Sequence, residues 1–255
     1  MPQDHTERFK DGHSYAAARP DYPAALIDQI RDRICAVPVI SDEIVIDVGA
    51  GTGLFTPQLA AALRRSIPIV GVEPSASMRS AAATLDQVTF VNGRSEKLPF
   101  ADRKARAITA ATSAHWFDWA AFYREATRVL VPGEIIAIIE YVRDETSPAA
   151  AAVEDFLTRY GERKAYSRPD YAMEIEAAGF MTIVTTSEHV RLSLSPNDFV
   201  DLALSSSHAA AVIEAIGRAG AEALLREKSE ELLDTDGSIS FGYRFNLVTA
   251  NRAIG

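Results

Sequence analysis

The sequence predicts an α/β fold: a Rossmann-like, doubly wound and mostly parallel sheet with helices on both faces. Two observations lead to this prediction. Between residues 44 and 142, apolar runs of strand length alternate with amphipathic stretches of helix length, the pattern of parallel strands joined by right-handed crossovers. The run at 44–48 is also rich in β-branched residues and leads directly into a glycine-rich turn at 49–53, followed by a helix expected at 54–65.

This turn is the feature around which the rest of the chain is expected to be organised. Gly49, Gly51 and Gly53 occupy alternate positions. Glycine allows a tight turn and lets a ligand approach main-chain atoms that a Cβ would shield. The helix that follows offers free N–H groups and the positive end of its dipole at the same point. A strand, a glycine-rich turn and a helix N-terminus together predict the nucleotide-binding crevice of a doubly wound sheet.

The spacing of the glycines and one carboxylate indicate which nucleotide binds. The glycines follow G-x-G-x-G, whereas the dinucleotide fingerprint is G-x-G-x-x-G. Asp47 precedes the first glycine by two residues, where a carboxylate suits a cationic ligand better than a diphosphate. Residues 47–53 resemble the first motif of the class I S-adenosylmethionine-dependent methyltransferases; the alternative is a turn without a ligand. The resemblance implies that S-adenosyl-L-methionine is the cofactor, held here by Asp47, Gly49, Ala50, Gly51 and Thr52.

Composition limits the class of protein and its partners. The 255 residues carry a net charge of −9, which argues against binding to a nucleic-acid backbone. Cys35 is the one cysteine, which excludes an internal disulfide and the usual zinc clusters; we expect it in the core, on the apolar side of a helix. No apolar run reaches about 18 residues, and residues 1–10 are polar. These features favour a cytoplasmic protein with a small-molecule partner, no metal and no membrane span.

The N-terminal region carries a second resemblance. A helix is expected from Pro23 to about residue 36. Before it, the segment Tyr-x-x-x-Arg-Pro-x-Tyr-Pro at 15–23 resembles the N-terminal signature of methyltransferases related to trans-aconitate methyltransferase. In that family the segment folds over the cofactor, which implies that Tyr15 and Arg19 lie near the methionine carboxylate and Tyr22 near the acceptor. The alternative is a simple lead-in to an amphipathic helix.

The second and third expected strands, at 67–73 and 88–91, end in polar residues that suit a nucleoside. Glu73, followed by Pro74, lies 20 residues after Gly53, where a carboxylate can accept both ribose hydroxyls. That role is shared with dinucleotide enzymes, so it does not distinguish the cofactors. Met78 is placed to lie against the adenine or to fill the core. The loop at 92–100 looks like the adenine-binding loop of the family, with Arg94, Ser95 and Glu96 as candidates, although many relatives carry an acidic residue in place of Arg94.

The fourth expected strand, 105–112, is rich in alanine and leads into an unusual aromatic patch. Thr112 ends the strand and is expected at the cofactor, and the patch at 113–119 contains His115, Trp116 and Trp119. This His-Trp-Phe-Asp run again resembles the trans-aconitate methyltransferase group. If the acceptor is a hydroxyl, phenol or amide, a base is required, and His115 is the first candidate. Trp116 is then an acceptor contact; alternatively, the aromatic residues are core and His115 is a polar neighbour.

The remaining chain is predicted to contain three further strands, or four if one segment is a strand pair, with helices between them. A helix is expected at 118–130, ended by the Pro-Gly pair at 132–133, and a strand at 134–142. Helices at 149–160 and 171–178 precede one long strand or a strand pair at 181–194. Three helical pieces cover 197–233, and a closing strand runs over 238–252.

The segment 195–235 is an insertion relative to a minimal class I methyltransferase, in which the last two strands form a simple hairpin. The resemblance therefore implies a seven-stranded sheet with a helical lid before the last strand, and the lid is a natural acceptor wall. Weaker candidate bases are Tyr141 and His208, and candidate pocket residues are Ser205, Ser206, Ser207, Tyr243 and Arg244. A cap that only buries apolar surface is the alternative.

The sequence thus predicts a single methyltransferase domain over 1–255. Its parts are a cofactor-covering segment with a helix (1–36), a Rossmann-like core (37–147) and C-terminal strands with the lid (148–255). The expected reaction transfers a methyl group to an oxygen or nitrogen atom of a small molecule. A nicotinamide-dependent oxidoreductase and a non-catalytic S-adenosylmethionine-binding protein are the alternatives. Neither the acceptor nor the oligomeric state follows from the sequence, and the lid lacks the arginine cluster that a tricarboxylate would require.

Overall fold

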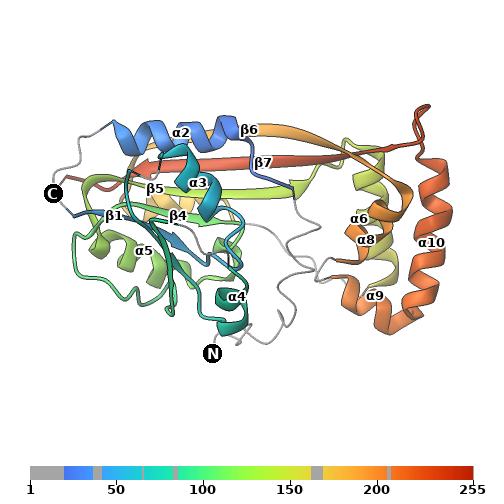
Figure 1. Ribbon diagram of the computed structural model, residues 1–255, viewed down its shortest axis with the longest axis horizontal. Coiled ribbons are helices and arrows are strands. Elements are labelled where there is room, and N and C mark those ends of the chain that lie inside the picture. The colour runs from blue at the N-terminus through green and yellow to red at the C-terminus, as the bar shows by residue number, and fades with distance from the viewer. Residues whose placement is uncertain are drawn as a thin grey trace.

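The computed structural model describes residues 20–36, 42–64, 66–82, 86–161, 169–205 and 208–254. Within these residues the chain forms one seven-stranded sheet between two layers of helices, and a group of helices lies beyond one end of the long strands (Figure 1). The strand order is β3-β2-β1-β4-β5-β7-β6. Strands β1 to β5 are parallel to one another, and β7 is antiparallel to both β5 and β6. The predicted doubly wound, mostly parallel seven-stranded sheet is therefore confirmed.

The strands differ widely in length. Their bounds are Ile44–Val48 (β1), Ile69–Val72 (β2), Val88–Val91 (β3), Ala105–Ala111 (β4), Leu130–Arg143 (β5), Met181–Leu194 (β6) and Ile239–Asn251 (β7). Alanine-rich β4 lies in the middle of the sheet and is buried along almost its whole length. Its small side chains suit a strand that is covered by helices on both faces.

Helices cover both faces because alternate strand residues point to opposite sides. The α-helices are Ala24–Cys35 (α2), Thr56–Ala62 (α3), Ala76–Ala81 (α4), Trp119–Val129 (α5), Pro148–Tyr160 (α6), Tyr171–Ala177 (α7), Pro196–Leu204 (α8), Ala209–Ile216 (α9) and Arg218–Glu231 (α10). Along β5, Ile135 and Ile139 belong to the cluster under α2 and α3, whereas Ile136 and Ile138 belong to the cluster under α5 and α7. The sheet thus has two separate apolar interfaces.

Two expected elements differ in detail from the structure, and one open alternative is decided. Strand β5 begins at Leu130, directly after α5, and continues through the Pro-Gly pair at 132–133, because Gly133 adopts φ +90° and its N–H donates to the Arg252 carbonyl. The segment 181–194 is one strand and not a pair. Helix α3 is shorter than expected, and the chain leaves helical geometry at Arg64, whose φ is +51°.

The expectation that Cys35 is a core residue is wrong, because Cys35 is exposed. Helix α2 buries Leu26, Ile27, Ile30 and Ile34 against the sheet. Cys35 is the last residue of the helix and lies next to Ile34, about 100° around the axis, where it no longer faces the sheet.

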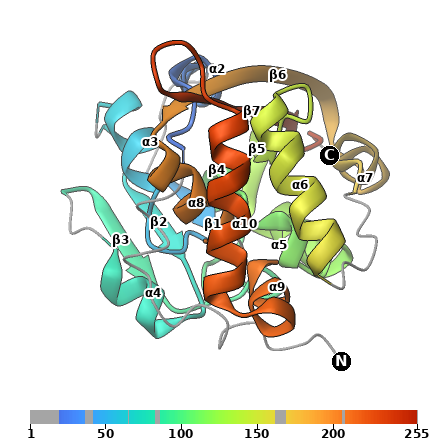
Figure 2. The ribbon, with the colours of Figure 1, turned by 90° about the vertical axis from the view of Figure 1, so that its right-hand side faces the viewer.

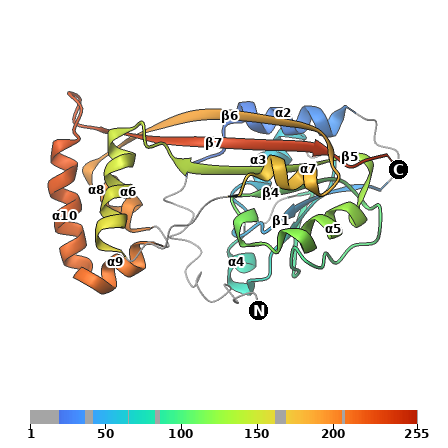
Figure 3. The same cartoon turned by 180° about the vertical axis from the view of Figure 1, so that it is seen from behind.

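Helices α6, α8, α9 and α10 form a group that we call the helical unit. It lies beyond the ends at which β5 and β6 finish and β7 begins, and Figure 2 shows these helices in front of the sheet when the molecule is viewed along the strands. Strands β5, β6 and β7 extend past the rest of the sheet to reach it (Figure 3). Within the unit, α10 packs on α8 and α9, and α6 packs on α9 and β7. The insertion at 195–235 is therefore part of a helical layer that faces the carboxyl ends of the parallel strands.

Among the described residues, no single helix is long and apolar enough to cross a membrane. Helices α8 and α9 meet that test only together, as a pair bent by 97°.

The opposite end of β4 contains a buried charge. Arg106 is fully buried, and its Nη2 donates to the Ile34 carbonyl over 2.8 Å. Its guanidinium lies 3.6 Å from a carboxylate oxygen of Glu43 and 3.7 Å from one of Glu134. Burial raises the pKa of Glu134 above its ordinary value, and the nearby Arg106 opposes that rise. Arg106 therefore links the C-terminal end of α2 to Glu43, just before β1, and to Glu134 on β5, the two strands that flank β4.

We predict that Arg106→Met lowers the free energy of unfolding at pH 7 by about 3–5 kcal/mol, because it leaves two largely buried carboxylates without their cation. Urea denaturation would measure this loss. Arg218→Met is the matched control: Arg218 pairs with Glu222 on the exposed face of α10, so its loss should stay below about 1 kcal/mol. Equal losses in the two variants would contradict the role given to the buried charge.

Candidate active site

The glycine-rich turn between β1 and α3 is held against the end of β2. Gly49, Gly51 and Gly53 all adopt positive φ values, +68°, +58° and +79°. The N–H groups of Gly49 and Ala50 both donate to the Val72 carbonyl, over 2.8 and 3.2 Å. Residues with a Cβ rarely adopt these dihedral angles, so the three glycines are required by the path of the backbone.

The loop that follows β4 rests directly on this turn. A Cβ added to Gly49 would lie 2.6 Å from the Cβ of Ser113, so the two backbones approach closely there. The Ser113 hydroxyl donates to the Val48 carbonyl over 2.8 Å. At Gly51, by contrast, an added Cβ would meet no atom of the described residues within 4 Å. The turn is therefore packed at its first glycine and open at its second, where a ligand has access to the backbone.

Asp47, at the end of β1, is fully buried beneath the turn. Its two carboxylate oxygens accept hydrogen bonds from the hydroxyls of Thr56, over 2.6 Å, and Thr109, over 2.9 Å. Burial raises the pKa of Asp47 from 3.8 to about 6; the two hydroxyls oppose the rise and the nearby Glu73 carboxylate adds to it. A positive charge brought close to the turn would therefore stabilise the ionised form without direct contact with its oxygens.

Glu73 follows β2 and joins the turn to the next helix. Its Oε2 accepts from the Gly51 N–H over 3.0 Å, and its Oε1 accepts from the Ser75 N–H over 2.8 Å. An ionised carboxylate has about four acceptor positions. The described residues occupy two of them, which leaves two for further donors such as hydroxyl groups. Burial raises the pKa of Glu73, although both backbone donors and Arg79 oppose that shift.

The other residues expected near the nucleoside lie on the same edge of the sheet. Met78 is buried in α4, whose N-cap is Ser75. In the loop after β3, Arg94 forms an isolated antiparallel bridge with Lys97. The Ser95 hydroxyl donates to Glu96, whose carboxylate also accepts from the Asp118 N–H, so this loop contacts the loop after β4.

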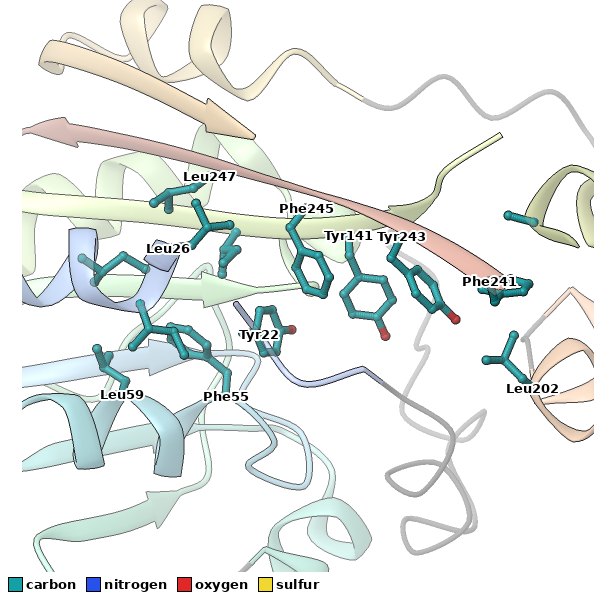
Figure 4. Close-up of a cluster of buried hydrophobic side chains, with 14 of the residues drawn as sticks. Tyr22, Leu26, Phe55, Leu59, Tyr141, Leu202, Phe241, Tyr243, Phe245 and Leu247 are labelled. Atoms are coloured by element: carbon teal, nitrogen blue, oxygen red, sulfur yellow. The ribbon is translucent and has the colours of Figure 1, made fainter. Parts of the chain in front are cut away.

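A row of aromatic side chains leads from this edge toward the helical unit. The Tyr22 hydroxyl lies 2.9 Å from the Thr112 hydroxyl, at the end of β4. The Tyr22 ring contacts the rings of Phe245 and Tyr141, and Tyr141 contacts Tyr243 with centroids 5.3 Å apart. Figure 4 shows Phe245, Tyr141, Tyr243 and Phe241 side by side along β5 and β7. These buried side chains form a continuous row from the strand ends to the helical unit.

His115 lies on the other side of the sheet end. It belongs to a short 3-10 helix, Ala114–Trp116, and its Nδ1 lies 3.1 Å from Oε1 of Glu140. The same Oε1 accepts a hydrogen bond from the Tyr171 hydroxyl over 2.6 Å. The neighbouring Trp116 ring lies 4.9 Å from the imidazole and is 37% exposed. A partly exposed imidazole is thus held by a buried carboxylate.

Most of the predicted site residues therefore lie at the carboxyl ends of four strands, β1 to β4, and in the loops that follow them. Tyr141 and Tyr243 lie in the aromatic row beside them. His208 is exposed at the start of α9 within the helical unit, and Arg244 is exposed on β7. Tyr15, Arg19, Ser206 and Ser207 lie outside the described residues.

Sequence reasoning missed the residues that hold the predicted ones in place. Thr56 and Thr109 enclose Asp47, and Glu140 and Tyr171 hold His115. Glu140 had a usable signal, because it is a carboxylate directly after the apolar run 135–139, at the end of a buried strand. Asp47 and Glu73 have the same placement on β1 and β2.

A parallel sheet with a glycine turn after β1 and a carboxylate after β2 is the arrangement of nucleoside-binding Rossmann-like folds. A family model described as "Methyltransferase domain" matches residues 46–138, which run from β1 into β5. This match, over the segment that carries the glycine turn, connects the chain with the methyltransferases. The narrower resemblance to the trans-aconitate methyltransferase group stays a prediction.

Individual relatives and solved structures are also described as methyltransferases. An uncharacterised methyltransferase-like protein of Schizosaccharomyces pombe is 31% identical over 150 residues, which cover 59% of this chain and 57% of the yeast protein. An uncharacterised methyltransferase of Mycobacterium tuberculosis is 28% identical over 198 residues, covering 76% and 74% of the two chains. This chain therefore spans little more than half the length of the first of these relatives.

Two solved structures share the fold. A protein of Anaeromyxobacter dehalogenans, described as a candidate type II methyltransferase, superimposes with a TM-score of 0.69 at 20% identity, covering 92% of this chain and 98% of its own. Phosphoethanolamine N-methyltransferase 2 of Haemonchus contortus, solved in complex with S-adenosyl-L-methionine, superimposes with a TM-score of 0.58 at 15% identity. That match covers 99% of this chain and 60% of the nematode protein.

We predict that Gly49→Ala destabilises the protein by about 1–3 kcal/mol more than Gly51→Ala. Both substitutions place a Cβ at positive φ, but only the first forces the Cβ against Ser113. Urea denaturation of the two variants would compare the losses. Equal losses would mean that the loop after β4 moves away without cost.

We predict that Asp47→Asn raises the free energy of unfolding at pH 7 by about 3 kcal/mol, the cost of ionising a carboxyl whose pKa is shifted from 3.8 to about 6. The folded state holds this proton more tightly than the unfolded state. The stability of the wild type therefore falls as pH rises from 3.8 to about 6, and the variant should lack that fall. Thermal unfolding between pH 4 and 7 would measure the difference. A less stable variant at pH 7 would contradict the prediction.

Proposed function

We propose that this protein transfers a methyl group from S-adenosyl-L-methionine to an oxygen or nitrogen atom of a small-molecule acceptor. The observation that carries the proposal is the convergence of the open glycine turn with two buried carboxylates, Asp47 and Glu73, at adjoining strand ends. The match of residues 46–138 to the methyltransferase-domain family supports it independently.

The residues present fit this cofactor. The open space at Gly51 gives a nucleoside access to the backbone, and Glu73 retains acceptor positions for the two ribose hydroxyls. Asp47 is a buried carboxylate at the same place, and a sulfonium or ammonium group nearby would offset the cost of its charge. A pyrophosphate would instead add negative charge beside these two carboxylates, which disfavours a dinucleotide.

When bound, S-adenosyl-L-methionine supplies a methyl group that is already activated by the positive charge on sulfur. The protein must then bind the acceptor in line with the transferred methyl group and exclude water. Orientation of this kind contributes up to about 7–11 kcal/mol to lowering a barrier. The aromatic row at Tyr22, Tyr141 and Tyr243 and the helical unit form the acceptor side in this proposal, and His115 is the group that removes a proton from the acceptor.

Calorimetric titration with S-adenosyl-L-methionine, S-adenosyl-L-homocysteine and NAD⁺ tests the cofactor directly. We predict binding of the first two and no binding of NAD⁺. Glu73→Gln should weaken binding about 10–100-fold, because charge-assisted hydrogen bonds to the ribose are lost. Glu222→Gln, on exposed α10, is the matched control and should bind as the wild type does.

Binding of NAD⁺ in preference to the sulfur nucleosides would overturn the proposal. Equal binding by Glu73→Gln and the wild type would remove Glu73 from the cofactor site.

A further inference from the structure

Three side chains from three separate elements meet at one carboxylate oxygen. His115 comes from the 3-10 helix after β4, Glu140 from β5 and Tyr171 from the first turn of α7. Oε1 of Glu140 lies 3.1 Å from the His115 Nδ1 and accepts from the Tyr171 hydroxyl over 2.6 Å. Glu140 and Tyr171 are buried, at 4% and 8% exposure, whereas the His115 side chain is 20% exposed.

The register of the sheet explains why these residues meet. Strand β4 ends at Ala111, which is paired with Ile139, so the next residue of β5 is Glu140, beside the point where β4 stops. There the chain turns sharply: the Thr112 N–H donates to the Ile139 carbonyl over 2.7 Å, and Thr112 adopts φ +50°. The turn delivers His115 to Glu140 three residues later. Helix α7 covers this face of the sheet and brings Tyr171 to the same oxygen.

The geometry determines which imidazole nitrogen carries the proton. The His115 Nδ1 lies 3.1 Å from Oε1 of Glu140, and an ionised carboxylate only accepts hydrogen bonds, so an ionised Glu140 requires Nδ1 to be the donor. Neutral histidine carries one N–H, which leaves the lone pair of its Nε2 available as a proton acceptor. The hydrogen bond from Tyr171 restricts the carboxylate and so the orientation of the ring. In serine hydrolases, a buried carboxylate holds the catalytic histidine in this way.

We propose that Glu140 is a positioning residue that holds His115 in the Nδ1–H tautomer, with Tyr171 restricting the carboxylate, and that the methyl acceptor therefore carries a protic O–H or N–H group. The inference rests on the proposed methyl transfer. A lone pair of the acceptor atom forms the new bond to the methyl carbon, and the electron pair of the S–C bond stays on sulfur. The acceptor's proton passes to Nε2 of His115 and from there to solvent. A tertiary amine or a carboxylate needs no such base.

The alternative is that Glu140 only anchors the loop after β4. Both roles require the Nδ1–H tautomer, so the tautomer tests the hydrogen bond itself; the comparison of acceptors separates the roles, because only a positioning residue makes turnover depend on the acceptor's proton. The chain also contains a second carboxylate–histidine pair, on other elements: the His189 Nδ1 lies 2.7 Å from Oδ2 of Asp144, on β6 and directly after β5. This second pair serves as an internal control.

The first experiment reads the tautomer by long-range ¹H–¹⁵N NMR spectra of the full, ligand-free chain, with His115→Gln and His189→Gln used for assignment. We expect His115 of the wild type to have Nδ1 protonated and Nε2 bare. Glu140→Leu removes the acceptor, so His115 should move toward the Nε2–H tautomer, while the His189 signals stay unchanged. Asp144→Ala should change only His189. Glu140→Gln retains an acceptor oxygen and should keep the wild-type tautomer.

An Nε2–H tautomer in the wild type, or an unchanged His115 in Glu140→Leu, would overturn the proposal. Calorimetric titration of each variant with S-adenosyl-L-methionine accompanies the spectra. Unchanged affinity in Glu140→Leu shows that the variant is folded and that its defect lies on the acceptor side. Failure of the wild type to bind the cofactor would instead contradict the proposed function, whatever the tautomer.

The second experiment compares acceptors. The wild type is incubated with S-adenosyl-L-methionine and matched sets of phenols, alcohols, primary amides, carboxylates and tertiary amines. We expect methylation of protic acceptors only. In His115→Gln, kcat for these acceptors should fall by about 100-fold or more. Glu140→Leu should lower kcat about 10-fold or more, with the KM for the cofactor unchanged. Transfer to a tertiary amine or a carboxylate, at a rate independent of His115, would overturn the assignment.

Discussion

The close backbone contact at Gly49 is the constraint on which the rest of the site depends. The turn donates two N–H groups to the end of β2, and Ser113 of the loop after β4 lies where a Cβ of residue 49 would be. The nucleoside side and the acceptor side are therefore parts of one packed arrangement. A residue larger than glycine at this point would separate the loop that carries His115 from the turn that faces the cofactor in the proposal.

Buried carboxylates at three strand ends give this edge of the sheet its electrostatic character. Asp47 lies near the end of β1, Glu73 directly follows β2, and Glu140 lies on β5 beside the end of β4; each is at most 9% exposed. Hydroxyl and backbone donors satisfy the first two, and burial raises the pKa of both. Such an edge favours positive charge, whether on a sulfonium cofactor or on an imidazole that has taken up a proton. The protein thus bears a cost in stability that a cationic ligand would offset.

Much of the fold and part of the site followed from local pattern. The alternation of strands and helices, the three glycines and the carboxylates after β1 and β2 were predicted because periodicity and dihedral preference are properties of short segments. Where the prediction was wrong, the deciding contact came from a distant part of the chain. Cys35 is exposed because the sheet contacts only the stripe of α2 that ends at Ile34, and β5 includes Gly133 because Arg252 pairs with it.

The sequence by itself determined the class of sheet, the place of the glycine turn and the presence of a histidine beside tryptophans at the end of β4. Only the tertiary structure decided how these groups are arranged: that Thr56 and Thr109 enclose Asp47, and that Glu140 and Tyr171 hold His115. The physical reason is strand register. Pairing of Ala111 with Ile139 places Glu140 beside the turn, and no local pattern records which residues of two separate strands become neighbours.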